Sequence, residues 1–190
     1  MKTIFTILLF VAFAFTAKAM VSNSVQVDNA GNLRREILNT FGDTKNIHTL
    51  IITGFLDARD FQFMRDSLPK LSELDIESVT INEYSGLNGT DPQISFYAAN
   101  ELPAFSFHNS YTGNSKVLLK VLKLPASITS IGYKALAGCT GFNDSIFTPS
   151  LVSSFSNDAF EGCSKLERFS VSPQNLYFTD IDGIIYSKDK

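Results

Sequence analysis

The chain has 190 residues, of which 44% are hydrophobic and 18% are charged, and its formal net charge at pH 7 is −3. This length suffices for one domain with a hydrophobic core or for a short array of repeats. The sequence contains no basic run that could follow a phosphate backbone and no basic amphipathic helix for a membrane surface, which argues against nucleic acid or a lipid surface as the partner.

Residues 1–19 have the features of a secretory signal peptide. Lys2 supplies a positive start, residues 4–15 are apolar apart from one threonine, and Ala17-Lys18-Ala19 fits a cleavage site before Met20. The apolar run of about 12 residues is shorter than the ~20 that a transmembrane helix needs. We therefore expect export and cleavage, and the alternative is an uncleaved N-terminal anchor.

A helix is predicted over residues 29–42, because apolar residues recur at helical spacing and Gly42 can end the helix. Asn29 or Asn32 is available as its N-terminal cap. The residues expected on its apolar stripe are Leu33, Ile37, Leu38 and Phe41.

Two strand-like segments follow, and the second repeats the pattern of the first. Each reads apolar-x-x-Leu-x-Ile, the first over residues 47–52 and the second over residues 71–76. Between them a helix is predicted to begin at Asp57 and to turn Phe61, Met64 and Leu68 inward. Residues 82–115 are less regular, with a turn-rich stretch at 85–92 and a polar insertion at 111–115. Residues 102–109 between these two are interpreted as an irregular repeat.

From residue 124 onward the chain repeats itself at the interval that separates the two earlier strand segments. Residues 124–139 are answered by residues 148–163, so that Pro125, Gly138 and Cys139 recur as Pro149, Gly162 and Cys163. A fixed period of roughly 20 to 50 residues is typical of a solenoid, in which each unit buries its apolar face against its neighbours. The turn at Gly138 is expected to need a positive φ or close packing.

Three sets of strand positions recur in this region. The first and second sets are one residue closer together in the sequence than the second and third sets. Alternate side chains of a short strand point to the same face, so the apolar members of each set are predicted to point inward. The sets are Leu119, Leu122 and Leu124; Phe142, Ser145 and Phe147; and Leu166, Phe169 and Val171.

The segment from Asn175 to Lys190 is predicted to form a hairpin, because Asp182-Gly183 separates two apolar runs that favour strands. Asp180 and Asp182 are faintly similar to a calcium loop, but Ile184 and Tyr186 occupy the positions of later ligands, so the hairpin is preferred. The hairpin either caps the array, or the chain is a shortened relative of a longer protein.

The two cysteines, Cys139 and Cys163, occupy equivalent positions in successive repeats. A disulfide is conceivable in an exported protein. Side chains at equivalent positions of stacked strands run parallel rather than toward each other, so two buried reduced thiols are preferred.

The repeat over residues 124–139, with its second copy ending Ala159-Phe160-Glu161-Gly162-Cys163, resembles the BspA-type leucine-rich repeats of Bacteroidetes surface proteins. Residues 175–190 and the N-terminal half are similar to other segments of the same proteins, so the resemblance covers roughly residues 25–190. It implies an adhesin that binds extracellular-matrix proteins, host cells or other bacteria. A shared fold does not fix function, so this implication is an analogy.

No sequence motif of an enzyme, a nucleotide site or a zinc site occurs. The two histidines, His48 and His108, are far apart in the sequence, and each is interpreted as an ordinary surface residue. The hypothesis is therefore a protein without catalysis, cofactor or metal.

The expected fold is an α/β leucine-rich-repeat solenoid, with short parallel strands, helical or irregular returns and a short C-terminal hairpin. Its expected divisions are a signal peptide (1–19), a helix with irregular repeats (20–100), BspA-type repeats (101–173) and the terminal segment (174–190). The expected function is that of an exported or surface-exposed module that binds a protein. The alternatives are an envelope protein that binds carbohydrate and a truncated relative of a longer protein. The outward residues predicted to contact a partner are His48, Thr49, Glu73, Asp75, Lys120, Lys123, Asp144, Glu167 and Arg168.

Overall fold

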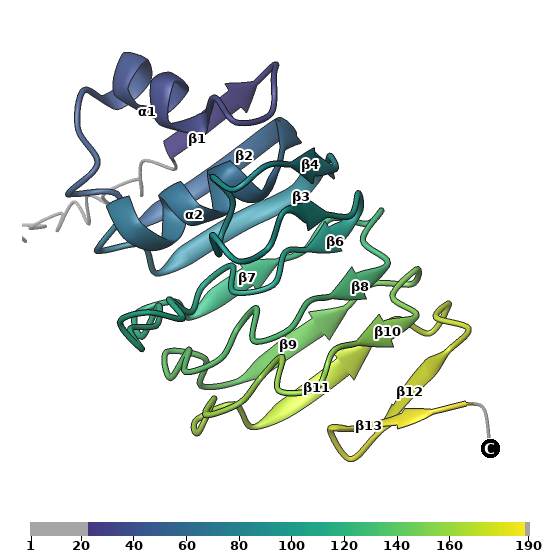
Figure 1. Ribbon diagram of the computed structural model, residues 1–190. Coiled ribbons are helices and arrows are strands. Elements are labelled where there is room, and N and C mark those ends of the chain that lie inside the picture. The colour runs from purple at the N-terminus through teal and green to yellow at the C-terminus, as the bar shows by residue number, and fades with distance from the viewer. Residues whose placement is uncertain (1–22, 189–190) are drawn as a thin grey trace, which may run out of the picture.

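The computed structural model describes residues 23–188, so the predicted signal peptide lies outside the described residues. Parallel strands run side by side from the N-terminal to the C-terminal end (Figure 1). The first sheet has the order β1-β2-β3-β7, and a separate parallel pair joins β11 to β9. The bounds are β1 Asn23–Val27, β2 Thr49–Leu56, β3 Glu73–Ile81, β7 Val121–Lys123, β9 Ser145–Thr148 and β11 Arg168–Val171.

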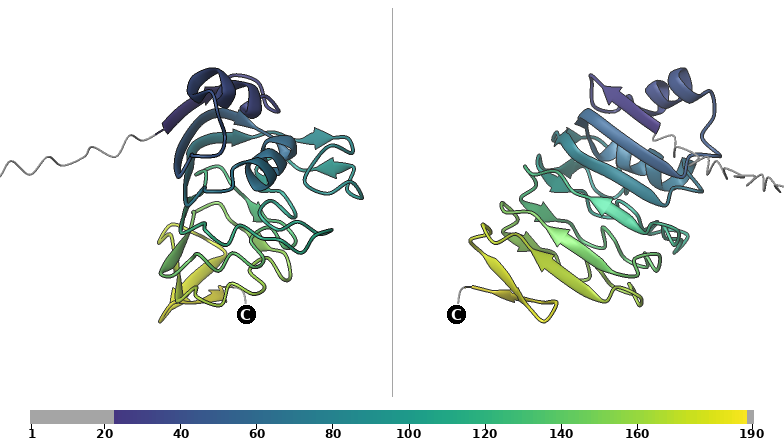
Figure 2. Two further views of the ribbon diagram at one scale, coloured as in Figure 1. Left: turned by 90° about the vertical axis from the view of Figure 1, so that its left-hand side faces the viewer. Right: turned by 180° about the vertical axis from the view of Figure 1, so that it is seen from behind.

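The chain returns between these strands along the opposite side of the molecule, as the turned views show (Figure 2). In the N-terminal half the return includes α1 (Leu33–Phe41) and α2 (Ala58–Ser67). In the C-terminal half it is a ladder of short parallel strands, β6 (Glu101–Leu102), β8 (Ser130–Ile131) and β10 (Ser154–Phe155). Two further short strands, β4 (Tyr84–Ser85) and β5 (Phe96–Tyr97), pair antiparallel.

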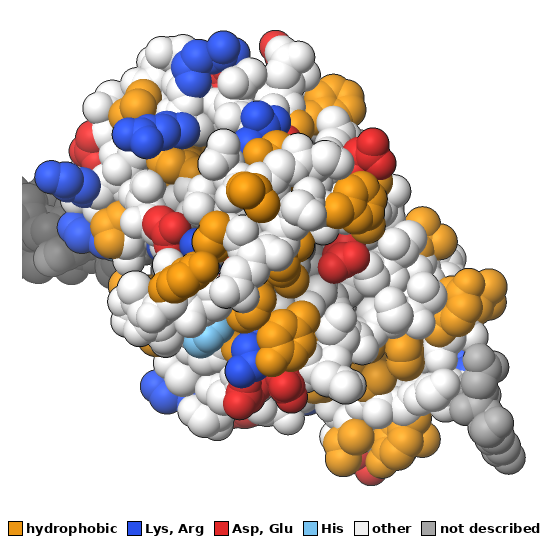
Figure 3. Space-filling model, in the orientation of Figure 1, with side chains coloured by type: hydrophobic (Ala, Val, Ile, Leu, Met, Phe, Trp, Pro, Cys, Tyr) orange, Lys and Arg blue, Asp and Glu red, His pale blue; other side chains and the backbone are white. Residues whose placement is uncertain are grey.

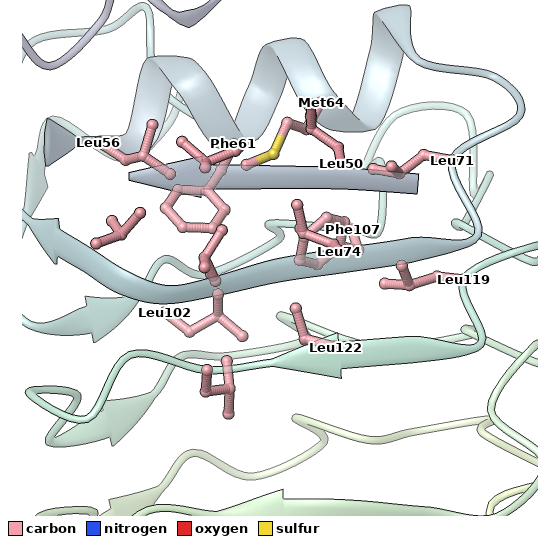
Figure 4. Close-up of a cluster of buried hydrophobic side chains, with 14 of the residues drawn as sticks. Leu50, Leu56, Phe61, Met64, Leu71, Leu74, Leu102, Phe107, Leu119 and Leu122 are labelled. Carbon is pink, nitrogen blue, oxygen red and sulfur yellow. The ribbon is translucent and has the colours of Figure 1, made fainter. Parts of the chain in front are cut away.

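The core lies between the parallel strands and the returning segments. Leu50, Leu74 and Leu122 point inward from β2, β3 and β7, and they belong to one buried cluster with Phe61 and Met64 of α2 (Figure 4). The predicted inward residues of both N-terminal strand segments are buried. The predicted second helix is also confirmed, because Asp57 caps it with a capping box and its three apolar residues face inward.

The first helix begins later than predicted and is capped from a distance. It begins at Leu33, and although Asn32 is the capping residue, its side chain makes no capping hydrogen bond. Instead the buried carboxylate of Asp60 in α2 accepts hydrogen bonds from the backbone N–H of Gly31 (2.6 Å), Leu33 (3.0 Å) and Asp57 (3.0 Å). Burial raises the pKa of Asp60 to about 6, against the effect of these three donors.

The prediction that Leu38 faces inward from this helix is wrong. Its side chain is 41% exposed, whereas Leu33 and Ile37 are fully buried. Successive helical residues are about 100° apart, so Leu38 lies beyond the narrow stripe that this short helix presents to the core.

The predicted irregular repeat is present in the return ladder. Leu102 of β6 pairs with Ile131 of β8. Farther along, the N–H of Phe107 donates to the carbonyl of Ala135 (2.8 Å), and the N–H of Leu136 donates to the carbonyl of Ala159 (2.9 Å). Residues 101–107 therefore stack on the next repeat as that repeat stacks on its successor.

Arg65 of α2 anchors this irregular segment, and its side chain is only 5% exposed. One guanidinium nitrogen, Nη1, donates to the carbonyls of Thr90 (2.7 Å), Phe105 (2.9 Å) and His108 (3.3 Å). The other two nitrogens bind the Asp66 carboxylate at 2.7 and 2.9 Å. One side chain thus satisfies three carbonyls that the chain supplies from residues 90–108.

The predicted inward positions of the middle repeat are partly wrong. Phe142 is buried, but Ser145 and Phe147 face outward, and Ile146 and Thr148 are buried in their place. The extra residue of this repeat lies before β9 rather than after it. The distance along the sequence from β7 to β9 is therefore one residue longer than that from β9 to β11. A shift of one residue in a strand moves every side chain to the opposite face.

The glycines at the repeat turns have positive φ, as predicted for Gly138, at 67° for Gly138 and 71° for Gly162. The two sites differ in space, because a Cβ at Gly138 would collide with the Ser115 hydroxyl, whereas at Gly162 the nearest atoms are 3.7 Å away. We expect Gly138→Val to lower the free energy of unfolding by roughly 2–4 kcal/mol in urea titrations.

Alanine at each site is the matched control for that experiment. Gly138→Ala and Gly162→Ala carry the same backbone cost, so the larger loss at Gly138 measures the clash. Equal losses for the two alanine variants would mean that the clash with Ser115 does not contribute.

The C-terminal hairpin is confirmed. It joins β12 (Phe178–Ile181) to β13 (Ile184–Ser187) through Asp182 and Gly183, which both have positive φ, as a two-residue type I′ turn requires. The Phe178 ring meets that of Phe155 at 5.0 Å between centroids and so covers the end of the core. The outer face of the hairpin is apolar, and Figure 3 shows hydrophobic side chains gathered there.

Asn175 fastens the hairpin to the preceding repeat, and it is fully buried. Its amide nitrogen donates to the carbonyls of Pro149 (2.9 Å) and Val152 (2.8 Å). Its amide oxygen accepts from the N–H of Tyr177 and of Phe178, both at 2.8 Å. All four hydrogen bonds of the side chain are therefore made.

Both cysteines are free thiols, as preferred from their spacing, with Cys139 buried and Cys163 half-buried. Burial raises the pKa of both thiols. The Cys163 thiol donates to the carbonyl of Leu136 at 3.1 Å. A raised pKa keeps a thiol protonated and hence poorly nucleophilic, so these two act as small packing groups.

Candidate binding surface

The parallel strands place outward side chains in rows. Because the strand pairs are in register, Thr49 lies beside Glu73 and Glu73 beside Val121 in one row. In the second row Ile51 lies beside Asp75 and Asp75 beside Lys123. The outward side chains of β2, β3, β7, β9 and β11 together are called the outer strand face, and the strands that carry it face the viewer in Figure 2 (right).

The nine residues predicted to contact a partner fall into two groups. Five lie on the outer strand face, namely Thr49, Glu73, Asp75, Lys123 and Arg168. Four lie at the residue just before a strand, namely His48, Lys120, Asp144 and Glu167. All are exposed or half-buried, and their role in binding stays a prediction.

Two pairs of these side chains touch each other. The Thr49 hydroxyl donates to a Glu73 carboxylate oxygen at 3.3 Å. The Lys123 ammonium binds the Asp75 carboxylate at 2.8 Å, which raises the pKa of Lys123. An exposed ion pair of this kind contributes little to stability, so its charges are available to a partner at little cost.

The residues before the strands are held by a repeated backbone contact. The carbonyl of His48 accepts from the N–H of Ser72 and Glu73, and the carbonyl of Asp144 accepts from Glu167 and Arg168. The side chains at these positions remain at the surface. The carbonyl of Ser72 in turn accepts from the N–H of Lys120, so the contact aligns His48, Ser72 and Lys120. The contact between Asp144 and Glu167 aligns these two residues separately.

The structure also exposes apolar residues that the sequence interpretation missed. Val121 is 44% exposed and Phe147 is 53% exposed on the outer strand face. The exposure of Phe147 could have been predicted from the sequence. The spacing between Pro125 and Pro149 also separates the inward Leu122 from Ile146, which makes Ile146 the inward residue of the next strand. Phe147 follows Ile146 in the strand, so this spacing would have placed it on the outward face.

Phe147 lines a hollow of about 480 Å³ in this surface. The hollow lies where the outer strand face ends and the chain turns toward the return side. Its other lining residues are Glu77, Leu122, Lys123, Leu124, Ala126, Pro149, Ser150 and Ser172.

His108 differs from the predicted ordinary surface residue, because it is half-buried. Its Nδ1 lies 2.9 Å from the Ser115 hydroxyl, and its ring stacks on Phe105. Burial lowers the pKa of His108. These contacts fold residues 105–115 onto themselves, which is a structural role.

Other buried ionisable groups also have structural partners. Lys116 is 6% exposed, its ammonium donates to the carbonyl of Leu68 at the end of α2, and burial lowers its pKa to about 8. No cluster of three or more His, Cys, Asp or Glu suited to a metal ion occurs within residues 23–188. No helix in that range has both the length and the apolar character needed to cross a bilayer.

Short parallel strands that recur at a nearly constant interval, with a ladder on the return side, define a leucine-rich-repeat protein. Residues 109–182 match the model of the BspA type leucine rich repeat region, so this region consists of BspA-type leucine-rich repeats.

Among solved structures, the chain is similar to a leucine rich cell surface protein of Faecalibacterium prausnitzii A2-165, with 19% sequence identity and a TM-score of 0.45. The similarity covers 75% of this chain and 28% of that protein, so the chain spans little more than a quarter of its length. No curated protein matches the chain.

Proposed function

We propose that this protein is a non-catalytic binding module, exported and displayed at the cell surface, whose repeats form a short solenoid. Its outer strand face binds a protein of the extracellular matrix or of another bacterial surface. The proposal includes a cleaved signal peptide before Met20 and repeats that begin in the N-terminal half and continue to residue 173.

The single observation that carries this proposal is the outer strand face. Its rows of side chains are fixed in register by backbone ladders, so they present a rigid surface that costs little conformational entropy on binding. The face combines the carboxylates of Glu73 and Asp75 with the ammonium group of Lys123, and Lys120 lies just before β7 at its edge. Such mixed charge orients a partner more than it adds affinity.

The test is a binding screen of purified residues 20–190 against extracellular-matrix proteins, mucin and a glycan array. Circular dichroism establishes that the sample is folded. Saturable binding to a protein is the expected result. A folded sample that binds only glycans would replace the proposal with a carbohydrate-binding module, and a folded sample that binds neither would refute it.

Reversing the charges of Lys120 and Lys123 to Glu should weaken binding to a protein ligand found in that screen by roughly tenfold. The melting temperature should change little, because the only ion pair lost within the described residues is the exposed one with Asp75. Surface plasmon resonance and thermal denaturation measure the two effects.

The control for this experiment reverses Arg34 and Arg35, which are exposed on α1, on the return side of the molecule and not on the outer strand face. It changes the net charge by the same amount. An equal loss of affinity in both variants would mean that net charge, rather than the outer strand face, attracts the partner.

A further inference from the structure

The outer strand face is interrupted between β7 and β9. In the described chain β7 pairs only with β3, and β9 pairs only with β11. The same two repeats are bonded on the return side, where β8 pairs with β10 and the N–H of Ser153 donates to the carbonyl of Thr129 (2.8 Å). The two repeats are therefore joined by backbone hydrogen bonds on the return side, whereas β7 and β9 lie close together without a backbone ladder.

The hollow of about 480 Å³ lies at this interruption. Residues 122–124 of the β7 segment line one side, and Phe147 and Pro149 of the next repeat line the other. Cavities of about 300–1,000 Å³ are typical of ligand-binding pockets. Because β7 and β9 remain adjacent, a ligand would lie over the hollow rather than between the two strands, and an extended peptide can occupy such a surface with its side chains.

A bulge in β3 directs a carboxylate to the same hollow. Ile51 of β2 pairs with Asp75, whereas Thr53 pairs with Ser78, so β3 holds one extra residue between these pairs. Glu77 lies in that bulge, is exposed and lines the hollow. Bulges of this type redirect a side chain and often occur beside binding sites.

Two charged residues line the hollow, Glu77 and Lys123. Asp75 and Lys123 neutralise each other, whereas Glu77 forms no ion pair within residues 23–188. A carboxylate on the rim of an apolar hollow complements a basic group that lies close to an apolar one.

We propose that this hollow binds an extended peptide segment of the protein partner, which places an apolar side chain against Phe147 and a basic side chain beside Glu77. The proposal rests on the proposed function and assigns the recognised chemistry to one part of the outer strand face.

The test uses a phage-displayed library of random dodecapeptides, selected on folded residues 20–190. Enriched peptides are expected to carry an apolar residue within a few positions of Lys or Arg. Their affinity should fall at least tenfold on Phe147→Ser and should fall on Glu77→Gln for the basic peptides. Phe96→Ser is the matched control, because Phe96 is similarly exposed, at 58%, on the separate β4–β5 pair.

Phe147→Ser should fold, since serine occupies the neighbouring outward positions 145 and 170. Ala126→Arg, which fills the hollow from an exposed position, is a second variant that should abolish binding of the same peptides. The proposal is overturned if no peptide is enriched, or if the enriched peptides bind Phe147→Ser and Ala126→Arg as well as the unchanged protein.

Failure of this proposal is distinguishable from failure of the proposed function. A matrix or bacterial protein that binds unchanged to Phe147→Ser and Ala126→Arg but is weakened by charge reversal at Lys120 alone, which does not line the hollow, would leave the proposed function standing. It would exclude the hollow as the place of recognition.

Discussion

Replacing Arg65 by Met should lower the free energy of unfolding by about 3–5 kcal/mol. The loss arises because the carbonyls of Thr90, Phe105 and His108 would each lose a donor at a site where the Arg65 side chain is only 5% exposed. Urea unfolding followed by circular dichroism gives the value.

Arg35→Met is the matched control for this change. Arg35 also lies in a helix and pairs with the acidic residue that follows it, at 2.6 Å from Glu36, but its side chain is 60% exposed. Its loss should cost under about 1 kcal/mol. If the two variants were equally stable, the three carbonyl contacts would contribute nothing and the irregular segment would be held by other groups.

Changing Asn175 to Asp should lower the free energy of unfolding by about 2–4 kcal/mol at pH 7, although the two side chains have nearly the same shape. The amide nitrogen that donates to Pro149 and Val152 would be replaced by a carboxylate oxygen facing two carbonyl oxygens. The hairpin should detach first, because this side chain joins it to the preceding repeat.

Acid should reverse part of this effect. Burial disfavours the charged form of the introduced carboxyl, so its pKa would be higher in the folded than in the unfolded state. The variant is then most stable below the unfolded pKa, and the deficit grows as the pH rises through the folded pKa. Asn157→Asp, at an exposed position, is the control, and a deficit that is the same at every pH would contradict this explanation.

The regular part of the fold was predictable from sequence because its signals are local. The apolar spacing before and within β2 and β3, the Asp57 cap of α2 and the Asp182-Gly183 turn each lie within a few residues of the structure they determine. The repeat period added the order of the strands. These elements were predicted with the correct burial.

The errors arise where a distant residue decides the outcome. The α1 cap comes from Asp60 of the next helix, and no local pattern around Leu33 indicates it. The register of β9 depends on an extra residue before the strand, which the spacing of leucines alone does not locate. The hollow combines that register with the bulge at Glu77 and with a missing strand pair, so it could not be predicted from any one segment.

The break between β7 and β9 also has a consequence for how the two repeats are joined. Across it they share one hydrophobic core and the backbone bonds of β8 and β10, but no backbone ladder joins β7 to β9. A peptide seated in the hollow would contact both repeats and so join them on the side where the backbone does not.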